Sequence, residues 1–260
     1  MITLGFLALG FISLIGAFLI EGGHAGSLVV DTAAMIVYGG TLAAVGTSFP
    51  FDLVKKIPTL FKKAMADGNE SHLKLVFYFV DTASLVRREG ILALEKNITQ
   101  SAEEIDRLTK TGLQLVADGV EEHLLRDVLE TYVENISERH KEGIAVMEAA
   151  GGFSPTMGII GTVMGLVHVL SNLSEPEKLG PAISVAFIAT LYGVATANLV
   201  WLPLATKLKA LNMREVHHRT MVVEAIIMIS QGLSHKIVEE RLKAFLEPEE
   251  LEKLESMAGH

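Results

Sequence analysis

The chain has 260 residues, of which 50% are hydrophobic, and its mean hydropathy is +0.40. A soluble domain of this size rarely averages above zero, because it needs a polar shell. The formal net charge is −9 and no basic run exceeds two residues, which argues against nucleic acid as a partner. The lack of cysteine excludes disulfides, thiol catalysis and thiolate metal sites.

Four apolar runs are each long enough to cross a bilayer, which needs about 20 mostly apolar residues. In chain order they cover residues 2–20, 28–48, 149–172 and 182–206. The first run lacks the basic segment that opens a signal peptide, and a second apolar run follows after a short loop. We therefore predict an all-α membrane protein with two transmembrane hairpins, at residues 1–50 and 149–206.

Basic residues predict the orientation of the spans, because loops rich in Lys and Arg stay in the cytoplasm. Of the 22 Lys and Arg residues, only Lys178 lies in a loop between paired spans. All the others lie at residues 55–141 and 207–253. We therefore expect a multi-pass membrane protein with both termini in the cytoplasm.

Between the hairpins, residues 51–148 form a densely charged segment that we interpret as a helical cytoplasmic domain. Apolar residues recur there at helical spacing, and turn signals lie at Asp67-Gly68-Asn69 and Asp118-Gly119. The last helix of this insert is expected to run from about residue 121 into the third span. The tail, residues 207–260, is predicted to be helical and cytoplasmic, with breaks near Gly232 and Pro248.

Ionisable side chains inside a membrane are costly and are functional candidates by default. Here they are few: His168 in the third span, Glu148 at its foot and Asp31 near the outer end of the second. None has a second carboxylate one helical turn away. We interpret His168 as packed or facing an interface rather than as a proton carrier, and Asp31 as a helix N-cap.

Small and hydroxyl side chains recur at helical spacing in the inner two spans. They are Gly158, Thr162 and Gly165 in the third, and Ala186, Thr190, Gly193 and Ala197 in the fourth. Ordinary helix packing explains such faces, because small side chains let backbones approach closely. The functional alternative is a groove for a partner helix, in which Thr162 and Thr190 supply oxygen ligands to a hard cation such as Na⁺. The membrane carboxylate would then come from the partner.

Two prolines fall in the same spans. Pro155 opens the third span, where a missing N–H costs nothing if the helix starts there. Pro203 lies near the end of the fourth and is expected to kink it by removing one backbone hydrogen bond. A kink between membrane and cytoplasm would be a hinge, whereas many such prolines are static.

Three segments together resemble the flagellar stator A-subunit family, known as MotA and PomA. They are residues 83–95 (ASLVRREGILALE), residues 153–166 (FSPTMGIIGTVMGL), and residues 189–205, which contain ATLYG and WLPLA. Their order and spacing match along nearly the whole chain. The plan of two outer spans, a large cytoplasmic insert, two inner spans and a tail matches as well.

The resemblance implies a subunit that, with a B subunit, conducts ions across the inner membrane and converts the ion-motive force into torque on the flagellar rotor. Five A subunits would surround two B subunits, each contributing one span with an ionisable aspartate and a peptidoglycan-binding domain. Arg87 and Glu95 would contact the rotor's torque ring, and Pro155 and Pro203 correspond to the family's two prolines. Without the family, Arg87 and Glu95 would be read as a solvated surface pair.

The coupling ion implied by the resemblance is Na⁺ or H⁺. Sodium-type members carry threonine at the position of Thr162, where proton-type members usually carry alanine, and Thr190 matches a family hydroxyl. Ala189 departs from the sodium pattern, which typically has a second threonine there. The pattern favours transient Na⁺ near Thr162 and Thr190, with no permanent metal and no cofactor.

The nearest rival is an ion-driven energiser of the ExbB/TolQ type, which shares the small-residue inner spans but has one early span rather than a hairpin. An intramembrane enzyme would need a catalytic pair within the spans, and the sequence has no G-x-x-x-x-G-K-[ST], H-E-x-x-H or G-x-S-x-G motif. A passive scaffold would leave Thr162 and Thr190 unexplained. We therefore predict a motor or channel subunit and not an enzyme.

Overall fold

The computed structural model describes residues 2–66, 72–101 and 105–258, and it contains no strand in those ranges. The predicted all-α fold class is thus confirmed. The chain divides into two compact units, one of Met1–Asp67 with His140–Ala210 and one of Gly68–Arg139 with Leu211–His260. We call the first the span unit and the second the charged unit. The turn predicted at Asp67-Gly68-Asn69 lies outside the described residues.

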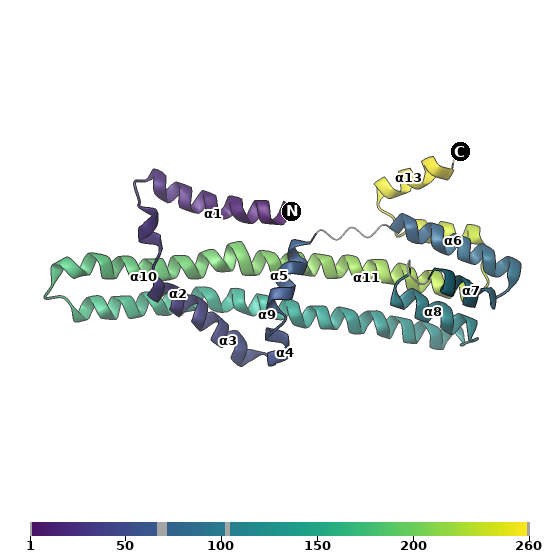
Figure 1. Cartoon of the computed structure of the whole chain (residues 1–260), viewed down its shortest axis with the longest axis horizontal. Helices are drawn as coiled ribbons and strands as arrows, with labels where there is room; N and C mark the ends of the chain where they lie inside the picture. The colour runs from purple at the N-terminus through teal and green to yellow at the C-terminus, as the bar shows by residue number, and fades with distance from the viewer. Residues whose placement is uncertain (1, 67–71, 102–104, 259–260) are drawn as a thin grey trace. The chain divides into compact units, whose positions relative to one another are not determined.

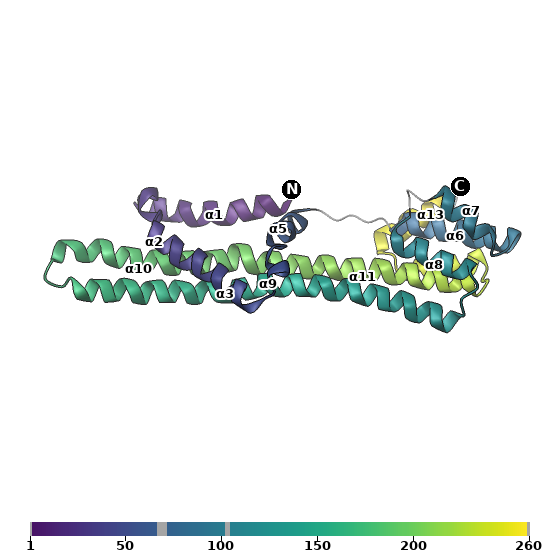
Figure 2. The same cartoon turned by 60° about the horizontal axis from the view of Figure 1, so that its bottom comes forward.

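The span unit begins with seven helical elements: α1 (Ile2–Ile20), the 3₁₀ turn η1 (Ala25–Leu28), α2 (Asp31–Ala34), the π-helical turn η2 (Met35–Gly39), α3 (Gly40–Ser48), α4 (Phe51–Val54) and α5 (Ile57–Met65). It is completed by most of α9 (Glu122–Ser171), by α10 (Pro176–Thr196), by the π-helical turn η3 (Ala197–Trp201) and by the start of α11 (Leu202–Ser230). In both views, α9 and α10 run side by side (Figures 1 and 2).

Four helices of the described chain are long and apolar enough to cross a membrane. The first coincides with α1, and the second runs from η1 to the end of α3. The other two predicted spans lie within longer helices, because α9 continues from Glu122 without interruption, as the sequence predicted. Where the bilayer begins along α9 and along α10–α11 stays a prediction.

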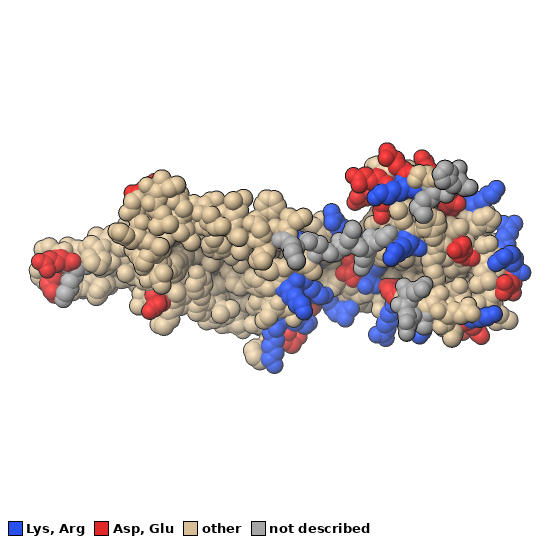
Figure 3. Space-filling model, turned by 45° about the horizontal axis from the view of Figure 1, so that its top comes forward, with Lys and Arg blue, Asp and Glu red and all other residues tan. Residues whose placement is uncertain are grey.

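The surface of the span unit is apolar. In α1 no residue is buried, and Phe6 and Ile12 are each 67% exposed. Figure 3 shows this surface mostly in tan with a few red side chains, and blue side chains appear near α4 and α5. In water, such an apolar surface would associate with other apolar surfaces. Lipid solvates it, provided that the backbone N–H and C=O groups are hydrogen-bonded within the helices. The span unit is therefore built to be surrounded by hydrocarbon.

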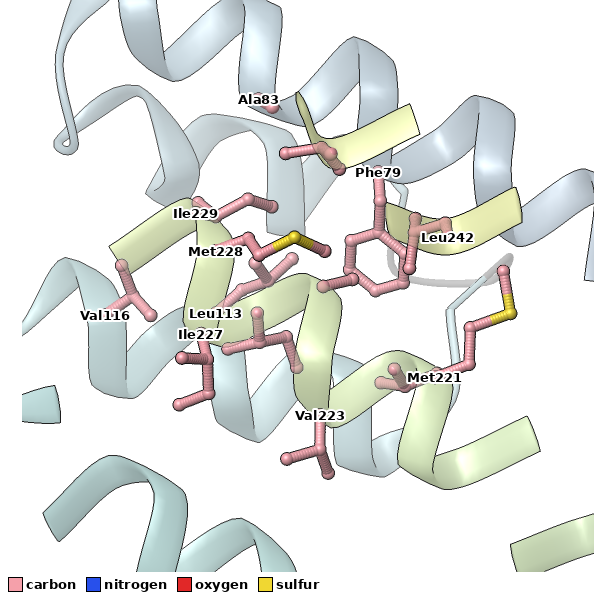
Figure 4. Packing of buried hydrophobic residues seen from close by; sticks show 14 of the residues in the cluster. Phe79, Ala83, Leu113, Val116, Met221, Val223, Ile227, Met228, Ile229 and Leu242 are labelled. Carbon is pink, nitrogen blue, oxygen red and sulfur yellow. The ribbon is translucent and has the colours of Figure 1, made fainter. Parts of the chain in front are cut away.

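The charged unit is organised around α11. Its other elements are α6 (His72–Glu89), α7 (Ala93–Gln100), α8 (Arg107–Ala117), the first part of α9, α12 (His235–Lys243) and α13 (Pro248–Ala258). Every residue from Met221 to Ile229 except Glu224 is buried, so this stretch of α11 is apolar on all sides and must be enclosed. Figure 4 shows side chains from α6, α8 and α12, including Phe79, Leu113 and Leu242, packed around it.

Glu224, the exception in that stretch, is held at the edge of the core by Arg126. Nη1 of Arg126 on α9 donates to Oε1 of Glu224 at 2.6 Å, and Glu130 accepts from the same nitrogen at 3.3 Å. The hydrogen bond to Glu224 raises the pKa of Arg126, while burial opposes the shift. Because both side chains are partly exposed, the pair is worth about 1 kcal/mol or less. The pair therefore contributes little to stability, and its main effect is to set the orientation of α9 relative to α11.

Glycines with positive φ follow helices in the charged unit. They are Gly90 after α6 (φ +86°), Gly119 after α8 (φ +75°) and Gly232 after α11 (φ +67°). This left-handed region is accessible to glycine without steric cost. The breaks predicted near Gly232 and Pro248 are thus confirmed, since α13 begins at Pro248.

The two prolines lie in different local structures. Pro155 is inside α9 and does not open a helix, so the explanation of a harmless first-turn proline is wrong. Helix α9 begins at Glu122 in the charged insert, so Pro155 is far from its first turn. Pro203 is the second residue of α11, which begins directly after the π-helical turn η3, and the N–H of Leu202 bonds to the carbonyl of Ala197. A wider helical turn thus lies next to the position where proline has no N–H to donate to the helix.

Candidate functional site

Helices α9 and α10 touch through their backbones. A Cβ built on Gly158 of α9 would lie 2.9 Å from the carbonyl oxygen of Ala189 and 3.1 Å from Cα of Thr190. A Cβ on Gly193 of α10 would lie 2.5 Å from the carbonyl oxygen of Ser154. These neighbours are backbone atoms, which cannot rotate away as a flexible side chain can. The small faces predicted from the sequence therefore do pack against each other.

Thr162 and Thr190, the two residues of the predicted ion path, meet at this interface. Their hydroxyls are hydrogen-bonded to each other, and either can be the donor. Thr162 Oγ1 also lies 3.0 Å from the carbonyl oxygen of Ala186 and 3.2 Å from that of Gly158. Thr190 Oγ1 lies 3.5 Å from the same Gly158 carbonyl oxygen. Both threonines are only partly buried, so the cluster is not sealed within the single chain.

The cluster has more oxygen lone pairs than protons. Two hydroxyl and two carbonyl oxygens are within reach of one another, and only the hydroxyls can donate. A hydroxyl donates once and keeps two lone pairs. The cluster can thus keep its internal hydrogen bonds and still present oxygen to a cation, which suits hard ions such as Na⁺. No three His, Asp or Glu side chains in the described ranges are placed to hold a metal ion.

Sequence reasoning missed two buried polar residues, and one of them, Ser154, extends the same interface. Ser154 is 0% exposed, and its hydroxyl donates to the carbonyl of Gly193 at 3.0 Å and lies 2.9 Å from Thr196 Oγ1. Ser154 precedes Gly158 by four residues, so the helical spacing that marked Gly158 and Thr162 could have found it. Thr41 of α3 is also buried, at 1% exposed, and its hydroxyl has no hydrogen-bond partner in the described chain.

Tyr192 ties the second span to α10. Its hydroxyl donates to the carbonyl of Leu28 and accepts from the N–H of Val30 at 3.2 Å. The ring of Tyr38 stacks on it with centroids 5.8 Å apart. A phenol that both donates and accepts fixes the register of two helices. No sequence signal identified this role, because the spacing within one helix does not reveal its neighbour.

The ionisable residues of the spans are outside the threonine cluster. His168 is exposed on α9, with its Nδ1 3.5 Å from the Asn172 amide nitrogen. Glu148 forms an ion pair with Lys209 of α11. Asp31 is the first residue of α2 and Val30 is the N-cap, so the N-cap prediction is wrong by one residue. A carboxylate in the first turn still interacts favourably with the helix dipole.

Arg87 and Glu95 are exposed in the charged unit. Arg87 lies in the last turn of α6 and Glu95 in the first turn of α7, on either side of Gly90 with φ +86°. Neither side chain forms an ion pair or hydrogen bond with another described residue. They are thus not a mutual surface pair, and both charges are available to a partner.

Comparison with known proteins gives consistent matches. Residues 100–221 match the MotA/TolQ/ExbB proton channel family. The chain is 35% identical to motility protein A of Bacillus subtilis (strain 168), over 92% of this chain and 88% of that protein. It is 38% identical to the uncharacterized protein YtxD of the same strain, over 85% and 80%. A chain in the structure of the flagellar MotAB stator complex from Bacillus subtilis matches with a TM-score of 0.90 and 34% identity, over 97% and 99%.

The all-helical fold of the described residues, the four candidate spans and the matches above define the class: this chain belongs to the MotA/TolQ/ExbB proton channel family. Its matches to motility protein A and to a MotAB stator chain cover nearly its whole length. These matches place it with the flagellar stator A subunits rather than with the energisers of the ExbB/TolQ type. The family resemblance seen in the sequence is confirmed.

The backbone contact at Gly158 predicts a sharp difference between two glycines of α9. Gly158→Ala should destabilise the chain by about 1–3 kcal/mol, because overpacking forces the helices apart. Gly152→Ala should be neutral or slightly stabilising, since a Cβ there meets nothing within 4 Å. Thermal unfolding of the purified full-length variants in one detergent measures both. Equal melting temperatures would contradict the close approach.

Proposed function

We propose that the chain conducts ions through the α9–α10 interface as the A subunit of a flagellar stator and converts the ion-motive force into torque on the rotor. The observation that carries this proposal is the Thr162–Thr190 hydroxyl cluster. It lies in spans without a carboxylate, since residues 149–172 and 182–206 contain no Asp or Glu. A neutral cluster can supply oxygen ligands to a passing cation but has no negative charge to balance it. The chain's chemistry in this role is ion ligation, without catalysis.

The missing charge is proposed to come from a B subunit with one span, a membrane aspartate and a peptidoglycan-binding domain. The α9 helix offers a surface for such a span, because it exposes the large apolar side chains Ile159, Ile160, Val163, Met164 and Val167. Partner helices as well as lipid cover such faces. The similarity to a chain of a MotAB stator complex supports an A–B assembly. Five A subunits around two B subunits is the arrangement implied by the family resemblance.

The proposed ion is Na⁺ rather than H⁺. A sodium ion must exchange water for protein oxygens, and Thr162 and Thr190 provide them, whereas a proton needs only the partner carboxylate. Ala189 is compatible with this choice. It is 1% exposed, and a Cβ on Gly161 would lie 2.5 Å from its Cβ. A threonine at position 189 would press on the backbone of α9, so packing alone accounts for the smaller residue.

Arg87 and Glu95 are proposed as the rotor contacts. Both charges are exposed and have no ion-pair partner among the described residues, which supports this role, because complementary charges steer docking and set register more than they add affinity. Pro155 and Pro203 are proposed as hinges. The π-helical turn before Pro203 supports a local change of helix geometry there, since π turns recur at functional sites.

The orientation follows from the distribution of basic residues: both termini and the charged unit are proposed to be cytoplasmic. The loops that the sequence predicts at residues 21–27 and 173–181 then face outward. Neither is long enough to hold a domain, so all larger soluble surfaces would be on the cytoplasmic side.

Thr162→Ala should weaken swimming in sodium. Losing one oxygen ligand costs on the order of 1–3 kcal/mol, or roughly 5- to 150-fold in ion occupancy. The sodium concentration that gives half-maximal swimming speed should therefore rise in Thr162→Ala. Thr162→Ser keeps the hydroxyl and should restore the wild-type sodium dependence. Thr156→Ala is the matched control, because that exposed hydroxyl bonds only to the carbonyl of Phe153 on its own helix. If the wild type swims equally well in sodium-free potassium buffer and stops with a protonophore, the chain is proton-driven.

Charge reversal should separate torque from assembly. Arg87→Glu or Glu95→Lys should reduce swimming while membrane levels stay unchanged, because both positions are exposed. Reversing the facing rotor charge should restore part of the motility. Lys110→Glu on α8 is a control with the same change of charge. Full motility in the double variant Arg87→Glu, Glu95→Lys would remove both residues from the rotor contact.

Single cysteines test the orientation. Gly26→Cys and Ser174→Cys should react with a membrane-impermeant thiol reagent in intact spheroplasts, because both would lie outside. A Cβ at Gly26 meets nothing within 4 Å, so the change is tolerated. Lys96→Cys and Lys236→Cys should react only after the membrane is opened. The opposite pattern would invert the topology.

A further inference from the structure

The segment that follows the second span carries positive charge without a partner. Lys55 and Lys56 lie between α4 and α5, and Lys62 and Lys63 lie in the last turn of α5. All four are exposed, and none forms an ion pair with another residue of the described chain. Asp52 is the only acidic residue in positions 51–65. The segment therefore presents a local excess of ammonium groups.

The opposite face of α5 is anchored to the span helices. Ala64 is 0% exposed and clusters with apolar residues of α9 and α11. A Cβ on Gly143 of α9 would lie 3.0 Å from Cδ2 of Leu60, and the ring of Phe61 meets Trp201 edge-on with centroids 5.4 Å apart. These contacts fix which side of α5 faces out. The lysines are thus displayed by a packed amphipathic helix and not by a loose tail.

The same segment lies where a span ends. The α3 helix stops at Ser48 and α4 begins at Phe51, which is 69% exposed. The ammonium of Lys55 lies 4.5 Å from the centroid of the Phe51 ring. An exposed ring beside an ammonium, with an indole nearby, is typical of the boundary between hydrocarbon and headgroups. Glu148, at the foot of the third predicted span within α9, is paired with Lys209 of α11.

We propose that α4 and α5 form a binding site for the headgroups of anionic phospholipids. The four ammonium groups match the negative phosphates of such a leaflet, and each basic residue near that surface strengthens binding. Phe51 adds an apolar contact with the acyl region, which a soluble phosphate cannot provide. Bound lipids hold the end of the second span at a fixed depth.

The test measures lipid binding on the full-length chain, purified with the subunits that accompany it from the membrane. Thermal unfolding is followed while dioleoylphosphatidylglycerol or dioleoylphosphatidylcholine is added. The wild type should be stabilised at lower concentrations of phosphatidylglycerol. The variant Lys55→Gln, Lys56→Gln, Lys62→Gln, Lys63→Gln should lose apparent affinity by about fivefold per lysine. Arginine at the same four positions should preserve it.

A matched variant changes four exposed lysines of the charged unit to glutamine: Lys74, Lys96, Lys110 and Lys236. Its response to phosphatidylglycerol should equal that of the wild type. An equal loss in both variants, or no loss in the first, would overturn the proposal and leave the lysines only to orient the spans during insertion. Stabilisation by inorganic phosphate alone would overturn it too.

If the fourfold variant does not melt cooperatively in phosphatidylcholine, the four single variants replace it. Each must then bind phosphatidylglycerol more weakly than the wild type, and four unchanged affinities would overturn the proposal. None of these readouts uses swimming or ion flux. Failure of the lipid site is therefore separable from failure of the ion path or of the rotor contact.

Discussion

The backbone contact between Gly158 and Gly193 is the constraint on which the span unit depends. A Cβ on Gly193 would lie 3.1 Å from Cα of Gly158, so nothing larger than hydrogen fits between the helices at this point. The same approach brings Thr162 of α9 against Thr190 and the Ala186 carbonyl of α10. Ser154 reaches the Gly193 carbonyl for the same reason. The hydroxyl cluster thus depends on two residues that have no side chain.

Hydrogen bonds between hydroxyls and carbonyls hold the α9–α10 interface together, because burial of apolar surface does not drive helix association in lipid. Lipid solvates apolar side chains as well as protein does, so helices in a membrane associate through packing and hydrogen bonds. Every hydroxyl of the α9–α10 interface has a protein partner, from Ser154 and Thr196 to Thr162 and Thr190. Their burial therefore avoids the cost of an unpaired polar group. Tyr192 extends the arrangement to the second span through Leu28 and Val30.

The sequence predicts what lies within one helix better than what lies between helices. The bounds of α1 and the continuity of α9 follow from apolar runs and helical spacing, and the small faces of α9 and α10 are visible in the same way. The partners of Tyr192 cannot be predicted in this way, because residue spacing within α10 does not show which helix lies opposite it. The π-helical turns η2 and η3 are also invisible, since one extra residue shifts the register without changing composition. Exposed Arg87 and Glu95 resemble any surface charges, and only the family resemblance singles them out.

Ion passage requires a site that binds and also releases. A carboxylate fixed within the α9–α10 interface would hold Na⁺ in a low dielectric and would be costly when empty. Hydroxyl and carbonyl oxygens avoid both problems, because they are neutral and already satisfied by one another when no ion is present. In the proposed function, the attraction depends on a charge carried by a different chain. Movement of that charge relative to α9 and α10 would raise and lower the affinity of the same oxygens for Na⁺. A neutral cluster would therefore allow relative motion of two subunits to be coupled to the movement of an ion.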